Sequence, residues 1–311
     1  MSVLQKSGPA VALLSVGIVA FAIQDLVMKL ASGTYPLHQA LAIRAVAALP
    51  VALIIVSMAG SISSLKGSTR AMWPRSLLLV VTNITYYVAL AALPMATVSA
   101  LYLTAPLLIT VLSVLFLSEK VGLVQWVAIL AGMAGVILIV HPGDGAFEWA
   151  MLLPLVSALA YAGSVIFVRK MKGDNDAAIM AFQGTLWLSL AGLAMGAMLG
   201  FGEMKAEIRW HPSADFLLSG WHWPTARDTG IMLLGGVVGS AATLFLTRAY
   251  AHSSASVLAP FEYTALLWSI LLGWLFFGHL PTSREWLGIA VLICAGLASV
   301  LFCKTQETEP A

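Results

Sequence analysis

Residues 101–120 read LYLTAPLLITVLSVLFLSEK, and residues 261–280, which lie 160 positions further along the chain, read FEYTALLWSILLGWLFFGHL. In both stretches a Thr-Ala pair precedes a continuous apolar run, so that Thr104-Ala105 falls on Thr264-Ala265. Runs without alternation of apolar and polar residues argue against half-exposed strands. The similarity is weak, as expected of an old duplication, and it predicts a chain built from two related halves.

The composition places these halves in a membrane. Of the 311 residues, 60% are apolar and 10% are charged, and the mean hydropathy is +0.94. An ordinary soluble domain carries about a quarter charged residues, and a soluble fold of this size could not hide so much apolar surface. The net charge of +2 is too small to hold a nucleic acid. We therefore expect a polytopic helical membrane protein whose partners are the lipid bilayer and a small molecule.

Ten segments are long and apolar enough to cross a bilayer, which takes about 20 mostly apolar residues. Their limits are 9–31, 36–58, 72–93, 97–117, 123–140, 148–170, 177–200, 229–249, 254–277 and 284–303. Most connections are short, which predicts that successive helices are antiparallel neighbours.

The repeat and the ten segments together predict the architecture. A second match, at an offset of 140, joins residues 20–29 to residues 160–169, so each half holds five spans. Because five is odd, the second half must enter the membrane in the opposite sense, and such inverted repeats are typical of alternating-access carriers. We expect an all-α integral membrane protein of ten transmembrane helices in two inverted five-helix repeats, residues 1–145 and 146–303. A short cytoplasmic tail, residues 304–311, follows.

Basic residues predict the orientation. With the N-terminus inside, ten Lys and Arg fall on inner segments and five on outer ones, so both termini should be cytoplasmic. One long outer connection, about 200–228, contains three tryptophans and two histidines. Tryptophan at a membrane edge anchors in the headgroup layer, and a lid or a histidine metal site are the alternatives.

Three ionisable residues lie within predicted spans, where a charged group costs about 2.5–3.5 kcal/mol. Asp25 and Arg44 lie about 10 Å below the same end of their helices at 1.5 Å per residue, so they could form an ion pair or contact substrate. Glu262 lies near mid-depth of its helix. Because burial favours the protonated form of a carboxyl group, Glu262 and Asp25 are candidates for proton coupling. The alternative for Glu262 is a hydrogen bond to a neighbouring Thr or Tyr that fixes helix packing.

Amide and aromatic side chains on several spans complete the candidate substrate site. A pocket of such groups suits a small organic solute with a flat or apolar portion, although each group alone could equally bond neighbouring helices. These candidates are Gln24, Asn83, Tyr86, Tyr87, Tyr102, Tyr161, Gln183, Trp187, Tyr263 and Trp268.

Two prolines and two faces of small residues are structural features of the spans. Pro106 and Pro260 each remove a backbone hydrogen bond inside a predicted span, which makes them hinge candidates or tolerated kinks. Small residues let helix backbones approach closely. Such residues recur at Gly235, Gly236, Gly239 and Ser240, and again at Ala131 and Gly135.

The chain resembles the EamA family of the drug/metabolite transporter superfamily over nearly its full length. The resemblance rests on the two five-span halves, on residues 101–106 with 116–120, and on their echoes at 259–264 and 273–279; Arg44 also matches the family's helix-2 arginine. The family pattern ends both of these helices with Gly-Glu, whereas this chain has Ser118-Glu119 and Gly278-His279. The second departure removes an acidic group.

This resemblance implies a bacterial inner-membrane carrier of small metabolites that works by alternating access. Similar members export amino acids, and others import vitamins or nucleoside-like cofactors such as riboflavin or S-adenosylmethionine. We expect efflux or exchange of an amino-acid-like or aromatic metabolite, with such import as the alternative. A passive channel and a membrane-embedded enzyme are the alternatives of another class. No catalytic, nucleotide-binding or metal-binding motif occurs, so we expect no enzyme activity, no cofactor and no metal.

Overall fold

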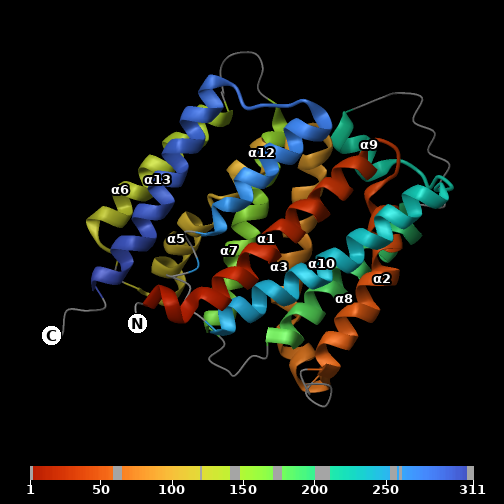
Figure 1. Ribbon diagram of the computed structural model, residues 1–311, viewed down its shortest axis with the longest axis horizontal. Helices are drawn as coiled ribbons and strands as arrows, with labels where there is room; N and C mark the ends of the chain where they lie inside the picture. Colours follow the sequence, from red (N-terminus) through yellow and green to blue (C-terminus); the bar gives the residue numbers. More distant parts are fainter. Residues whose placement is uncertain are drawn as a thin grey trace.

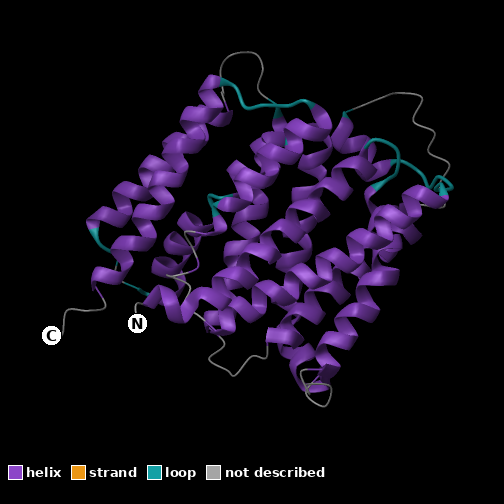
Figure 2. Cartoon of the chain, viewed as in Figure 1, coloured by secondary structure: helices purple, strands orange, loops and turns teal. Residues whose placement is uncertain are grey.

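All secondary structure in the described part of the chain is helical (Figure 2). The computed structural model describes residues 3–58, 65–119, 121–140, 148–170, 177–199, 211–252, 258 and 261–306. The helices are α1 (Val3–Ser32), α2 (Leu37–Met58), α3 (Leu65–Ala92), α4 (Met95–Tyr102), α5 (Ala105–Leu117), α6 (Leu123–Val140), the 3-10 turn η2 (Trp149–Met151), α7 (Leu152–Lys170), α8 (Ala177–Leu199), α9 (Pro212–Leu218), α10 (Ala226–His252), α12 (Thr264–Phe277) and α13 (Ser283–Gln306).

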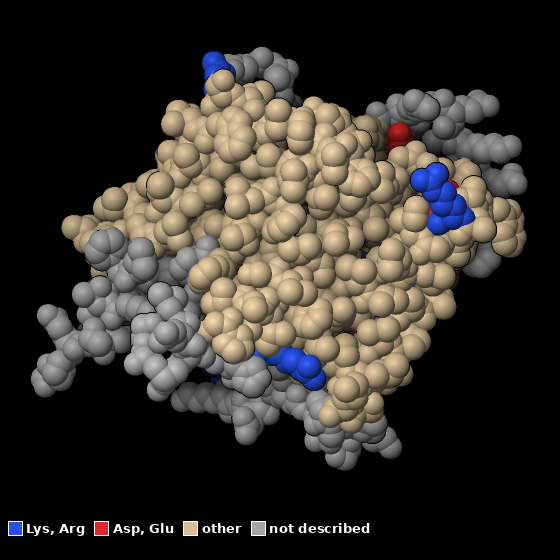
Figure 3. All heavy atoms as spheres, viewed as in Figure 1, with Lys and Arg blue, Asp and Glu red and all other residues tan. Residues whose placement is uncertain are grey.

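The described helices fit a membrane. Eight helical segments among the described residues are long and apolar enough to cross a bilayer, with α4 and α5 forming one of them; α12 is a shorter apolar helix. On the face drawn in Figure 3, the coloured charged residues gather toward the two ends of the bundle. The broad band between them is uncharged, as a surface that faces hydrocarbon requires.

The predicted span 97–117 is not one continuous helix. It breaks after Tyr102, and α5 starts at Ala105 with Pro106 in its first turn. A proline there loses no hydrogen bond, because the first N–H groups of a helix have no intrahelical partner. The proline therefore begins a second helix instead of kinking one. Its counterpart Pro260 lies outside the described residues.

Local geometry repeats at the offset of 160 residues. The Thr104 hydroxyl donates to the Leu101 carbonyl at 2.7 Å, and the Thr264 hydroxyl donates to the Phe261 carbonyl at 2.6 Å. Two residues end α5 and α12 in the left-handed conformation: Ser118 at φ 56° and Gly278 at φ 67°. The two halves therefore share hydrogen-bonded details as well as sequence.

The halves are interleaved. Helix α1 packs against α10, and its counterpart α7 packs against α3; α2 lies beside α8, and α6 beside α13 (Figure 1). This set of contacts is unchanged when each helix is exchanged for its counterpart in the other half. Such invariance is the mark of a pseudo-two-fold axis.

The second half runs in the opposite direction to the first. Lys29, near the end of α1, donates to the carbonyls of Leu90 and Leu93 at the end of α3. Ser213 of α9 donates to the Val88 carbonyl, and His211 before α9 contacts Glu148 just ahead of η2. The end of α1 and the beginning of α7 therefore lie at the same face of the bundle, and the inverted repeat is confirmed.

Glycines allow the closest contacts between helices. A Cβ on Gly236 of α10 would lie 2.3 Å from the Arg44 carbonyl oxygen of α2. One on Gly135 of α6 would lie 2.8 Å from the Gly288 carbonyl oxygen of α13. The predicted packing role of these small-residue faces is confirmed.

We predict that Gly236→Ala destabilises the protein, because the added methyl group meets backbone that cannot move aside. Overpacking of this kind costs about 1–3 kcal/mol, measurable as a lower midpoint of thermal unfolding in detergent. Gly230→Ala in the same helix is the matched control, since a Cβ there has nothing within 4 Å and alanine favours the helix. Equal unfolding midpoints for the two variants would contradict the packing argument.

Candidate substrate-binding site

Asp25 of α1 lies at the end of a hydrogen-bond chain that crosses four helices. The Tyr86 hydroxyl of α3 donates to Asp25 Oδ2 at 3.1 Å and lies 3.1 Å from Ser99 Oγ of α4. Ser99 Oγ in turn lies 2.7 Å from Ser269 Oγ of α12. Because Tyr86 has one hydroxyl proton and gives it to Asp25, Ser99 must donate to Tyr86 and Ser269 to Ser99. Every hydroxyl group in this hydrogen-bond series therefore donates in the direction of the Asp25 carboxylate.

Arg44 of α2 is held by the neighbouring tyrosine of α3. Its Nη1 donates to the Tyr87 hydroxyl at 2.9 Å, and Gln24 Nε2 donates to the same oxygen at 2.6 Å. The guanidinium carbon lies 5.8 Å from the centre of the Tyr87 ring. A Cβ on Gly239 of α10 would lie 1.6 Å from Gln24 Oε1, so only glycine leaves room for this amide. Four helices therefore fix the position of the Arg44 side chain.

The direct ion pair between Asp25 and Arg44 is not formed in this conformation. The ion pairs among the described residues, with an N···O limit of 4.0 Å, are Arg169–Glu119 and His211–Glu148. Each interior charge instead contacts its own tyrosine, and the rings of Tyr86 and Tyr87 are 6.1 Å apart. In this conformation each charge therefore has a tyrosine of α3 as its partner in place of the other charge.

Three tyrosine rings extend from Asp25 across the boundary between the halves. The ring centres of Tyr86 and Tyr102 are 5.3 Å apart, and those of Tyr102 and Tyr161 are 5.8 Å apart. We call Tyr86, Tyr102 and Tyr161 the tyrosine ladder; they come from α3, α4 and α7.

Glu262 contacts a tyrosine of its own half. Its Oε1 accepts a hydrogen bond from the Tyr250 hydroxyl of α10, which is the tyrosine contact expected as an alternative to a coupling role. Asp25 and Glu262 thus each accept a hydrogen bond from a tyrosine hydroxyl.

These interior side chains remain partly accessible to solvent. Asp25, Arg44, Glu262 and the tyrosine ladder are all part-exposed, whereas Gln24 and Tyr87 beside them are buried. Asp25 and Tyr86 lie six or more residues inside their helices and contact other helices. Both side chains therefore keep some accessible surface beside their contacts with other helices.

The remaining predicted site residues do not join this cluster. Asn83 donates to the Leu79 carbonyl of its own helix at 2.7 Å. Gln183 is buried on α8, and Trp187 packs against the core formed around α2 and α3. Tyr263 packs over Gly296 of α13, and Trp268 packs against a core that contains residues of α1 and α10. These residues belong to helix–helix contacts in this conformation.

The cluster includes three residues that were not among the candidates: Ser99, Ser269 and Tyr250. Serine is common in apolar spans and has no periodic signal, so sequence alone could not have singled out Ser99 and Ser269. Tyr250 ends a polar face on α10 that begins at Ser240, and that face was the available signal.

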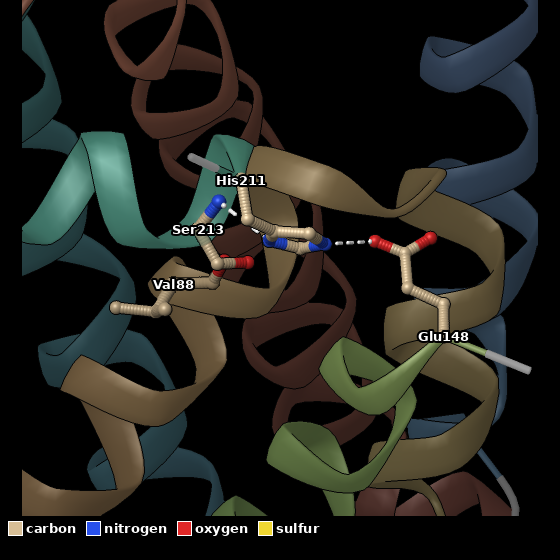
Figure 4. Close-up of polar contacts among 4 residues, drawn as sticks. All are labelled: Val88, Glu148, His211 and Ser213. Atoms are coloured by element: carbon tan, nitrogen blue, oxygen red, sulfur yellow. Dashed lines mark hydrogen bonds and ion pairs between the residues drawn. The ribbon is translucent and has the colours of Figure 1, made fainter. Parts of the chain in front are cut away.

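At the face where α1 ends, polar contacts join His211 and Ser213, at the start of α9, to neighbouring segments (Figure 4). His211 Nε2 lies 2.7 Å from Glu148 Oε1, and His211 Nδ1 accepts from the Ser213 amide at 3.2 Å. The Ser213 hydroxyl donates to the Val88 carbonyl at 2.8 Å. Among the described residues no cluster of three metal-ligating side chains occurs; His211 contacts a carboxylate instead. Trp223 is 99% exposed, as a headgroup anchor requires.

Further hydrogen bonds join the two halves at this face. The Tyr35 hydroxyl donates to Asp228 Oδ2 at 2.7 Å, and this bond raises the pKa of Tyr35, which remains a donor at neutral pH. Gln39 Nε2 donates to the His222 carbonyl at 2.5 Å, and the Thr97 hydroxyl donates to a Glu285 carboxylate oxygen at 2.8 Å. A movement that separates the two halves at this face must break these bonds.

We predict that Tyr87→Phe destabilises the protein more than Tyr161→Phe does. The first change leaves Gln24 and Arg44 without their common acceptor, and a buried group without a partner costs about 1–3 kcal/mol. Tyr161→Phe removes a hydroxyl for which no hydrogen bond is recorded among the described residues. Thermal unfolding of the purified variants measures the difference, and equal midpoints would contradict the role assigned to Tyr87.

The comparisons with known proteins agree with this geometry. The chain is 32% identical over 222 residues to a riboflavin transporter of Rhizobium johnstonii, covering 71% of this chain and 67% of that protein. It is 25% identical over 296 residues to the pseudopaline exporter CntI of Pseudomonas aeruginosa, covering 95% and 96%. A solved crystal structure matches with a TM-score of 0.60 at 18% identity, covering 97% of this chain and 99% of the other.

The model of the EamA-like transporter family matches this chain twice, at residues 8–141 and 148–302. These two matches cover the two halves that the repeat and the helix contacts define. The protein is thus a multi-pass membrane transporter of small molecules and not an enzyme. The chain belongs to the EamA-like transporter family.

Proposed function

We propose that this protein imports a flat heteroaromatic nutrient of the riboflavin class across the bacterial inner membrane by alternating access. The observation that carries the proposal is the tyrosine ladder that begins beside Asp25. Similarity to a riboflavin transporter supports it and favours the import alternative over efflux of an amino-acid-like solute. Export remains the second candidate, because CntI aligns with nearly the whole chain.

The ladder suits a planar ring system. Its rings are tilted or edge-on to one another, with angles of 77° and 50° between their planes. An aromatic pair adds about 0.5–1.5 kcal/mol beyond area burial, so a flat solute that contacts two rings gains affinity without needing a charge. The hydroxyl groups of the same tyrosines can bond to polar atoms at the edge of that solute.

Alternating access requires that the α9 face open. The hydrogen bonds of Tyr35, Gln39 and Thr97 to the second half would then have to break. The interruption between α4 and α5 gives the first half a place to bend, so Pro106 remains our hinge candidate, with Pro260 as its counterpart. If both termini are cytoplasmic, the α9 face is the outer one.

Proton coupling follows from the two carboxylates. Asp25 and Glu262 each accept a hydrogen bond from a tyrosine, Tyr86 and Tyr250 respectively. A substrate that binds to either hydroxyl removes that donor, and a carboxylate left without it in the interior favours its protonated form. Substrate binding and proton binding would thereby be linked.

We predict that proteoliposomes containing the protein take up radiolabelled riboflavin and that riboflavin trapped inside stimulates uptake by counterflow. Tyr102→Ala should lower the transport rate at least about tenfold, because it removes the middle ring of the ladder. The contacts of a bound flat solute with that ring and its neighbours contribute about 1.4 kcal/mol or more, and a loss of this size corresponds to a tenfold change in rate. Tyr102→Phe keeps the ring and should retain most of the rate. Uptake without counterflow would favour a channel. Absence of riboflavin transport in either direction would refute the proposal.

Glu262→Gln should lower transport and flatten its dependence on pH, because glutamine cannot bind and release a proton. Glu119→Gln is the matched control: Glu119 pairs with Arg169 at an exposed position away from the ladder, and the pH profile should keep its shape. Rates measured in proteoliposomes over the pH range in which the protein stays folded test the prediction. A Glu262→Gln profile that matches the wild type throughout would exclude the carrier role of this carboxyl group.

A further inference from the structure

We infer that Asp25 and Arg44 together recognise the imide edge of the substrate, an N–H group flanked by two carbonyl oxygens. The isoalloxazine ring of riboflavin has such an edge. The inference rests on the proposed function and adds to it the polar contact that selects among flat substrates. The two residues would bind the substrate while the tyrosine ladder supports its ring.

Each of the two charged groups keeps unused hydrogen-bonding capacity. Asp25 uses Oδ2 for the Tyr86 hydroxyl, and no hydrogen bond to Oδ1 is recorded among the described residues. Arg44 uses Nη1 for the Tyr87 hydroxyl, although a guanidinium has five N–H donors. Both side chains are part-exposed, and neither has a buried polar atom left without a partner. The free oxygen and the free donors are therefore within reach of a solute.

The placement of the two groups suits an edge that contains donor and acceptors. No Asp25–Arg44 contact occurs within 4.0 Å, but the two groups bond to the adjacent residues Tyr86 and Tyr87, whose ring centres lie 6.1 Å apart. An imide presents acceptor, donor and acceptor side by side. Its N–H can donate to Asp25 while one carbonyl oxygen accepts from Arg44, so a neutral molecule satisfies both charges.

Neighbouring contacts hold this pair in position beside the ladder. Tyr86 is both the donor to Asp25 and the first ring of the ladder, so a ring lying on Tyr86 has its edge close to Asp25. Gln24 and Tyr87 hold Arg44, and the close approach of Gly239 fixes Gln24. A site built to bond an N–H group rejects an analogue that lacks it, because its own polar group is then left unpaired.

A zwitterionic amino acid is the competing ligand for the same two charges. Its ammonium group would face Asp25 and its carboxylate would face Arg44. The ladder of three rings favours the flat heterocycle, since a small amino acid leaves those rings uncovered. A competition experiment, in which free amino acids are added to bound riboflavin, distinguishes the two ligand classes.

The test compares riboflavin with 3-methylriboflavin, in which a methyl group replaces the imide hydrogen and the ring system is otherwise unchanged. Fluorescence titration of the purified full-length protein in lipid nanodiscs measures both dissociation constants. We expect the wild type to bind 3-methylriboflavin at least about tenfold more weakly. In Asp25→Ala the two flavins should bind with similar affinity, because the acceptor is absent and the space accommodates the methyl group.

Glu262→Gln is the matched control, since it changes the other carboxylate of the interior and should keep the wild-type ratio of the two dissociation constants. Arg44→Gln should weaken both flavins by a similar factor, because both keep the carbonyl groups. If Asp25→Ala fails to fold, Asp25→Asn replaces it; its neutral oxygen still accepts a hydrogen bond, so the ratio should shrink without disappearing.

Three results would overturn the inference. Equal binding of both flavins by the wild type would refute the imide contact and leave the proposed function standing. If free amino acids displace riboflavin at concentrations near the dissociation constant of riboflavin, Asp25 and Arg44 bind a zwitterion and not an imide edge. No binding of riboflavin by the folded wild type would refute the proposed function as well.

Discussion

The interior of this protein depends on two adjacent tyrosines of α3 that satisfy two charges. Hydrocarbon supplies no hydrogen bonds, so Asp25 and Arg44 must find partners within the bundle. Tyr86 donates to the carboxylate, and Tyr87 accepts from the guanidinium. A direct ion pair would have neutralised both groups and left neither free for a solute. Placing a neutral hydroxyl against each charge lowers the cost of burial and keeps some of its bonding capacity for substrate.

The interleaving of the two halves explains why this arrangement can serve transport. Helix α3 packs mainly against α7 and α8 of the other half, and α1 packs against α10. A movement of one half relative to the other therefore changes the contacts that cross between them, which include Tyr102 with Tyr161 in the tyrosine ladder and Ser99 with Ser269. Glycines such as Gly236 and Gly135 let backbones touch at the crossings, so the helices can shift as rigid units around the polar interior.

The sequence predicted the candidate site in part, and the successes and failures have physical causes. Asp25, Arg44 and Glu262 stand out because charge in an apolar span is costly. The tyrosines stand out by type, but their grouping does not, because contacts between helices far apart in the chain leave no local pattern. Tyr263 and Trp268 resemble the ladder residues in sequence and yet pack into separate helix–helix cores. Which side of a buried helix faces the substrate cannot be derived from a helix that is apolar all round.

The sequence by itself determined the membrane location, the rough limits of most spans, and the duplication with its inversion, since these follow from hydropathy, length and an odd number of crossings per half. Ten spans were expected, and eight helical segments among the described residues are long and apolar enough to cross a bilayer. Tertiary structure alone decided that Asp25 and Arg44 each bond to a tyrosine of α3, that the tyrosine ladder crosses from the first half to the second, and that α9 bonds to α3. The reason is that these features arise from contacts between helices far apart in the chain, and a uniform apolar environment leaves them no periodic trace along the sequence.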